Sequence, residues 1–294
     1  MVARVSAFNI LLSVVLCFIG FSMLYMHISK MNNRHLNIKL RQSNLDTWQQ
    51  DLIKNKIKKG FSTQDYCGEL FKDANIELDE YSASYARQKE AYITQLKGLG
   101  KYKIEGNSGR KKEQQLFYWI LGGMSSVRTI CEIGFNAGHS ALVWLESNPN
   151  AHLYSFDLNV HKYTPLMASY LKEIYPKRFD IYYGRSDTVI PTISQKENIS
   201  CDILVVDGGH KGDQALRDIV NMKRLAHKDS LLIVDDTAYG AGYTKHVMAS
   251  VNKLLSCNYM NLQFLCSYKK KRDGGFAVFT YNLNNNHTCV FTIS

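Results

Sequence analysis

The stretch "RTICEIGFNAGHSALVWLES", residues 128–147, decides the fold. Its first residues, RTICEIG (128–134), are apolar and β-branched enough to predict a buried strand. A glycine-containing turn follows, and residues 138–147 have the composition of a helix. A strand that passes through a glycine turn into a helix is the first unit of a parallel sheet.

The same alternation continues to the end of the chain. Further strands are expected at 152–158, 179–184, 202–209 and 230–236, with a closing pair at 261–268 and 274–282. Helices are expected between them, at 165–176, 186–195, 213–226 and 244–256. This regularity predicts an α/β fold: a Rossmann-like, doubly wound, mostly parallel seven-stranded sheet with helices on both faces. Ligands of such sheets bind at the carboxyl ends of the strands.

Acidic residues follow two neighbouring strands of the expected sheet. "VVDGGH" (205–210) places Asp207 and His210 after one strand, and "LLIVDD" (231–236) places Asp235 and Asp236 after the next. Three carboxylates at adjacent strand tips repel one another unless a cation or protons neutralise them. Oxygen ligands of this kind suit Mg²⁺, Mn²⁺ or Ca²⁺ rather than zinc. The alternative is that one aspartate caps a helix and another faces water.

A second group of residues fits a nucleoside. The glycine turn has the pattern E-x-G-x-x-x-G-x-S, from Glu132 to Ser140, and not the spacing of the dinucleotide motif. Asp157 ends the next strand and is suited to two ribose hydroxyls. Ser186 and Asp187 follow the third strand, where an adenine would lie. Taken alone, the turn is better explained as a tight connection; the turn, Asp157 and the third-strand tip together, in this order and spacing, favour a nucleoside.

These residues, over about 110–282, resemble the class I S-adenosylmethionine-dependent methyltransferases. The resemblance implies that the turn passes the methionine part of the cofactor, that Asp157 binds the ribose and that the third-strand tip borders the adenine. The residues that it assigns to the cofactor S-adenosylmethionine are Glu132, Gly134, Asn136, Gly138, Ser140, Asp157, Ser186 and Asp187.

The acidic tips resemble the metal-dependent O-methyltransferase branch, with Asp207, Asp235 and Asp236 as ligands of a divalent metal, Mg²⁺ or Mn²⁺. Catechol O-methyltransferase-like enzymes have a lysine base three residues after the metal aspartate, whereas this chain has His210 there. They also usually carry Asn in place of Asp236. The pattern is closer to sugar and macrolide-sugar O-methyltransferases and to the cephalosporin-hydroxylase-like group, which favours an aliphatic or sugar hydroxyl as acceptor.

His210 and Asp207 are accordingly the expected catalytic residues, with His210 as general base near neutral pH. A helix-capping or supporting role for His210 stays open, with Lys211 and His246 as other bases. Tyr239 and Tyr243 are candidates for the acceptor pocket. Two other readings also stay open: a metal-independent methyltransferase acting on another nucleophile, and a non-catalytic scaffold that retains the fold.

The N-terminus predicts attachment to a membrane. Residues 7–28 are nearly all apolar and contain no Asp, Glu, Lys or Arg, a length that spans a bilayer as an uncleaved signal anchor. Basic residues after the segment favour a cytoplasmic domain by the positive-inside rule. The sequons at Asn198 and Asn286 favour a lumenal one. We expect a single-pass protein with its catalytic domain in the lumen of the Golgi or endoplasmic reticulum.

Seven cysteines are present, and six lie outside the apolar segment, so disulfides are permitted. Cys131 and Cys201, which adjoin core strands, are expected to be plain buried thiols. The net charge is +10, but Lys and Arg are scattered, so nucleic acid is not expected as a partner. The expected partners are a small-molecule or glycan acceptor and the membrane; the oligomeric state is not predicted.

The expected organisation has five parts. They are a cytoplasmic tail and signal anchor (1–29), a stem (30–75), a helical extension (76–123), the S-adenosylmethionine-binding domain (124–284) and a C-terminal tail (285–294).

Overall fold

The computed structural model describes residues 83–100, 102, 104, 112–237, 242, 244–267 and 275–284. The predicted membrane anchor, the stem and the C-terminal tail lie outside these residues. No helix within the described ranges is both long and apolar enough to cross a membrane. Tyr239, Tyr243 and the second sequon at Asn286 also lie outside them.

Seven strands form one mixed sheet in the order β3-β2-β1-β4-β5-β7-β6. The strands are β1 (Thr129–Ile133), β2 (His152–Asp157), β3 (Phe179–Tyr183), β4 (Cys201–Val206), β5 (Ala226–Asp235), β6 (Met260–Ser267) and β7 (Gly275–Tyr281). Strands β1 to β5 are parallel, and β7 is antiparallel to both β5 and β6. The predicted seven-stranded, mostly parallel sheet is confirmed.

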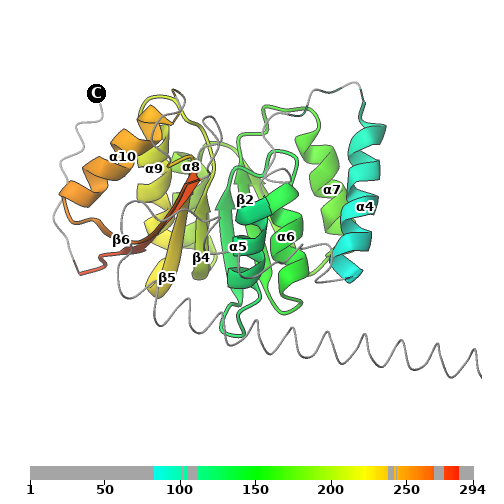
Figure 1. The fold of residues 1–294 in the computed structure, drawn as a ribbon, viewed down its shortest axis with the longest axis horizontal. Coiled ribbons are helices and arrows are strands. Elements are labelled where there is room, and N and C mark those ends of the chain that lie inside the picture. Colours follow the sequence, from blue (N-terminus) through cyan, green and yellow to red (C-terminus); the bar gives the residue numbers. More distant parts are fainter. Residues whose placement is uncertain are drawn as a thin grey trace, which may run out of the picture. The chain divides into compact units, whose positions relative to one another are not determined.

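Helices cover both faces of the sheet (Figure 1). They are α4 (Ala83–Gly98), α5 (Lys112–Gly122), α6 (His139–Ser147), α7 (Thr164–Ile174), α8 (Ser186–Lys196), α9 (Gln214–Met222) and α10 (Lys245–Ser256), with a 3₁₀ turn η3 at Lys223–Leu225. Figure 1 shows α8, α9 and α10 on one side and α4 to α7 on the other. This division follows from the right-handed crossovers between parallel strands, which reverse direction at β1.

The reversal of strand order lies between β1 and β4. The chain runs from β1 outward to β2 and β3, then returns to place β4 on the other side of β1. Residues Ile130–Ile133 pair with Ile203–Val206 across this junction, and both strands are almost fully buried. A crevice at the carboxyl ends of the strands is expected at such a switch point.

The prediction that Cys131 and Cys201 are free thiols is wrong. The two sulfurs form a disulfide between β1 and β4, with the Cα atoms 6.0 Å apart. The cysteines are 70 residues apart in the chain, and only the return of β4 to the side of β1 brings them together. Cys257 and Cys266 are disulfide-bonded as well, so each of the four cysteines in the described ranges is oxidised.

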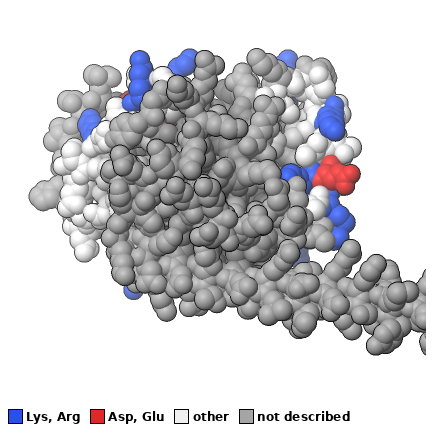
Figure 2. All heavy atoms as spheres, in the orientation of Figure 1, with Lys and Arg blue, Asp and Glu red and all other residues white. Residues whose placement is uncertain are grey.

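Basic side chains are dispersed over the described part of the face drawn in Figure 2. In the view of Figure 2, Lys and Arg appear at separate points around the rim and form no continuous stripe. The excess of positive charge in the chain is therefore not concentrated on the described part of this face.

Candidate active site

A cavity of about 590 Å³ lies at the carboxyl ends of the parallel strands. It is lined by residues from the tips of β1 to β5 and from the first turns of α6, α8 and α9. The residues on its wall that the sequence singled out are Gly134, Asn136, Ser140, Asp157, Ser186, Asp187, Asp207, His210, Asp235 and Asp236. The fold therefore brings the proposed cofactor residues and the acidic tips into one cavity.

Gly134 makes this junction possible. Its backbone has φ +99°, and a Cβ atom there would lie 1.9 Å from the carbonyl oxygen of Asp207. Any side chain would force the tips of β1 and β4 apart. Gly138, with φ +76°, is under a similar restriction, because a Cβ atom would lie 2.5 Å from the ring of Phe135. Both glycines of the E-x-G-x-x-x-G-x-S pattern are thus required by local packing.

Asn136 is held in the turn by three hydrogen bonds. Its backbone N–H donates to Asp157 Oδ2 (2.8 Å), its side-chain oxygen accepts from Tyr163 (2.7 Å), and its carbonyl accepts from Thr164 (2.7 Å). Its φ of 52° lies in the left-handed region, which Asn tolerates better than most residues. The turn is therefore fixed before any ligand binds.

Asp157 is a fixed acceptor at the tip of β2. It is buried, and its second oxygen accepts the N–H of Asn159 (2.7 Å). Each oxygen thus keeps a lone pair for another donor. This arrangement fits the predicted binding of ribose hydroxyls.

Glu132 lies behind the turn. It is 1% exposed, and its oxygens accept hydrogen bonds from Ser140 (2.9 Å) and Ser155 (2.7 Å). Neither Glu132 nor Gly138 belongs to the cavity wall that the described residues define. Burial raises the pKa of Glu132 to about 7, against the opposing effect of the two hydroxyl bonds. Its position indicates that Glu132 supports the glycine turn from the core side, through the hydrogen bond from Ser140.

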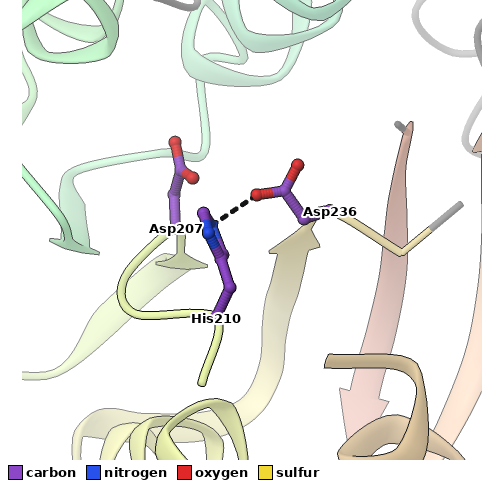
Figure 3. A group of neighbouring side chains, drawn as sticks. All are labelled: Asp207, His210 and Asp236. Carbon is purple, nitrogen blue, oxygen red and sulfur yellow. Dashed lines mark ion pairs between the residues drawn. The ribbon is translucent and has the colours of Figure 1, made fainter. Parts of the chain in front are cut away.

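The acidic tips form a compact group with His210. Ligand atoms of Asp207, His210 and Asp236 lie within 4.8 Å of one another. His210 Nε2 lies 2.5 Å from Asp236 Oδ2, and Figure 3 shows the imidazole between the two strand tips, directed at Asp236. Asp236 has φ 57°, a left-handed backbone that turns its side chain out of the strand register. Asp235 also lines the cavity, but it is outside this group.

Every buried carboxylate in the described ranges lies at this cavity or directly beneath it: Glu132, Asp157, Asp218, Asp235 and Asp236. Buried acids are costly unless a hydrogen bond, a proton or a cation compensates them. Hydrogen bonds compensate Glu132, Asp157 and Asp218, and His210 lies beside Asp236.

Sequence reasoning missed Asp218, which lies on α9 and lines the cavity. The signal was present, because Asp218 lies on the apolar face of this helix, among Ala215, Ile219 and Met222. Lys211 and His246, the other candidate bases, do not belong to the cavity wall formed by the described residues.

Comparison with known proteins agrees with this geometry. Residues 131–237, about a third of the chain, match the family model described as a methyltransferase domain. No curated protein matches the chain. Residues 131–237 are therefore similar to methyltransferase domains, which confirms the predicted resemblance to the class I S-adenosylmethionine-dependent methyltransferases.

Solved structures, among them two O-methyltransferases, share the fold. The O-methyltransferase TomG from Streptomyces achromogenes, in complex with SAM, is 16% identical with a TM-score of 0.53, over 72% of this chain and 94% of that one. An O-methyltransferase from Bacillus cereus in complex with SAH is 12% identical with a TM-score of 0.55, over 72% and 96%. Cofactor-bound Rv0187 from MTB is 15% identical with a TM-score of 0.56, over 74% and 99%. At these identities the likeness establishes the fold.

The raised pKa of Glu132 predicts a pH dependence of stability. A carboxyl whose folded pKa exceeds its unfolded value of 4.5 contributes stability that is fully present below pH 4.5 and is lost as the pH rises through 7. The loss across this window is on the order of 3 kcal/mol. Urea unfolding between pH 4.5 and 8 should show this decline in the parent chain and a flatter profile in Glu132→Gln. The exposed Glu173→Gln serves as control; equal slopes in all three proteins contradict the assignment.

Proposed function

We propose that this chain is an S-adenosylmethionine-dependent O-methyltransferase whose acceptor is a small-molecule or sugar hydroxyl. The observation that carries the proposal is the union, in one cavity, of the rigid glycine turn and Asp157 with the group Asp207, His210 and Asp236. The methyltransferase domain and the O-methyltransferase neighbours support it.

The cofactor brings a methyl group on a cationic sulfonium, and its transfer to a hydroxyl releases one proton. The residues of the turn and Asp157 are placed to orient the nucleoside and the methionine part. When no metal is bound, His210 is placed to accept the proton from the acceptor oxygen, and Asp236 holds the imidazole and stabilises the cation that forms.

A divalent metal fits the group in ligand type and spacing. Asp207, His210 and Asp236 would hold it, and a bound metal ion would stabilise a deprotonated acceptor oxygen. One imidazole beside two carboxylates is a donor set better suited to Mn²⁺ than to Mg²⁺. This set differs from the predicted Asp207, Asp235 and Asp236, since His210 takes the place of Asp235.

A second candidate is metal-independent methyl transfer. The direct contact of His210 Nε2 with Asp236 favours it, because a histidine with a carboxylate partner is a complete general base without an ion.

Calorimetric titration of the full chain, purified in detergent, separates these proposals. We expect micromolar binding of S-adenosylmethionine and binding of Mn²⁺ that is tighter than that of Mg²⁺. Asp207→Ala/Asp236→Ala should weaken Mn²⁺ binding at least tenfold and retain the cofactor, because Asp157 and the turn are intact. The exposed Asp229→Ala is the matched control.

Three other outcomes have distinct meanings. Cofactor binding without any metal signal supports the His210–Asp236 base. Loss of Mn²⁺ binding in Asp235→Ala, but not in His210→Ala, supports the ligand set predicted from sequence. A parent chain that binds no S-adenosylmethionine contradicts the proposed function.

We further propose that the domain lies in the lumen of the Golgi or endoplasmic reticulum, anchored by residues 7–28. Disulfides persist in oxidising compartments, and the four described cysteines are all disulfide-bonded. Asn198, in the sequon NIS, is exposed in the connection between α8 and β4, where a glycan can be attached.

A lumenal domain predicts N-glycosylation at Asn198. Expressed in a eukaryotic secretory system, the full chain should lose apparent mass on treatment with peptide N-glycosidase. Asn198→Gln should remove one glycan unit from that shift, and Asn286→Gln provides the comparison at the other sequon. A chain whose mass does not change on treatment argues for a cytoplasmic domain.

A further inference from the structure

Ser186 and Asp218 form a polar pair on the wall of the cavity. Ser186 is the first residue of α8, at the tip of β3, and Asp218 reaches it from α9. Asp218 is 7% exposed, and the Ser186 hydroxyl donates a hydrogen bond to its Oδ1. The pair lies on the same wall as Asp157, at the end of the cavity formed by β2 and β3.

This pair offers hydrogen-bond acceptors to the cavity. Ser186 has one proton and gives it to Asp218, so its oxygen keeps only acceptor positions. The other oxygen of Asp218 lies close to Gly208, where a Cβ atom would be only 2.8 Å away. Only glycine at position 208 lets Asp218 Oδ2 take this place, and Asp218 still forms part of the cavity wall.

The neighbouring charged groups are already paired. Asp187 receives two hydrogen bonds from the Arg185 guanidinium, at 3.0 and 2.5 Å. Arg217 lies 2.7 Å from Asp213. Unlike Asp187, Asp218 is buried, and it has no arginine partner within ion-pair distance in the described ranges.

We propose that the Ser186–Asp218 pair recognises the exocyclic amino group of the adenine, with Asp218 as the residue that selects adenine over a 6-oxopurine. The inference rests on the proposed function, and it moves recognition of the base from Asp187 to a residue of α9. An amino group donates to the two acceptors. A 6-oxo group would set its own lone pairs against them, and unmatched buried polar groups are strongly rejected.

Binding of two product nucleosides to the full chain tests this assignment. S-adenosylhomocysteine and its 6-oxo analogue S-inosylhomocysteine are titrated by calorimetry at pH 7.5, and the ratio of their Kd values is the readout. We expect the parent chain to prefer the adenine compound at least tenfold. Asp218→Asn should bring the ratio close to one, because the amide supplies a donor that a 6-oxo group accepts.

Two further variants make the result specific. Ser186→Ala, which leaves Asp218 in place, should lower the ratio in the same direction. Asp187→Asn tests the alternative that Asp187 recognises the base. It should keep the parental ratio of the two Kd values, as should the exposed Asp229→Asn. Because the readout is a ratio, a general loss of stability does not imitate it.

The outcomes separate this inference from the proposed function. A parent chain that binds S-adenosylhomocysteine, with the ratio unchanged in Asp218→Asn or lost in Asp187→Asn instead, overturns the role of Asp218 alone. A parent chain that binds neither compound overturns both proposals.

Discussion

The contact between the tips of β1 and β4 is the constraint on which the site depends. Gly134 has no side chain and a positive φ, so its backbone lies directly against the carbonyl of Asp207. One consequence is that the glycine turn and the acidic group occupy the same cavity. The turn is held independently, because Asn136 is hydrogen-bonded to Asp157 at the tip of β2 and to Tyr163 just before α7.

The disulfide between Cys131 and Cys201 acts on the same two strands, within the core. It covalently fixes β1 beside β4 at the point where strand order reverses. Glu132 follows Cys131 in β1. It accepts hydrogen bonds from Ser140 and Ser155, and so it links this strand to α6 and to β2. The strand junction, the buried acid and the turn thus form one continuous support beneath the cavity.

The sheet and much of the site could be predicted from the sequence, because the alternation of strands and helices and the acidic residues at strand ends are visible in it. Alternating strands and helices predicted a parallel sheet. Acidic residues at the strand tips predicted a site at one edge of it, since parallel strands end at the same edge. Asp157 and the turn were found in the same way. Their places at the ends of strands are visible in the sequence, although the hydrogen bonds that hold Asn136 come from Asp157, Tyr163 and Thr164.

The features that were missed depend on contacts distant in sequence. The disulfide requires β4 to return beside β1, which no local pattern specifies. Asp218 lies on a helix, and only the neighbouring Ser186 and Gly208 make it a wall of the cavity. The grouping of Asp236 with His210 rather than with Asp235 depends on the left-handed backbone at Asp236, which rotates one of two adjacent acids.

A crystal structure of the full chain grown with S-adenosylhomocysteine and Mn²⁺ tests the central claim most directly. The account predicts the nucleoside along Asp157, with its base beside Asp218, and an anomalous manganese peak coordinated by Asp207, His210 and Asp236. A nucleoside bound outside this cavity, or a cavity that stays empty at saturating concentration, would contradict it.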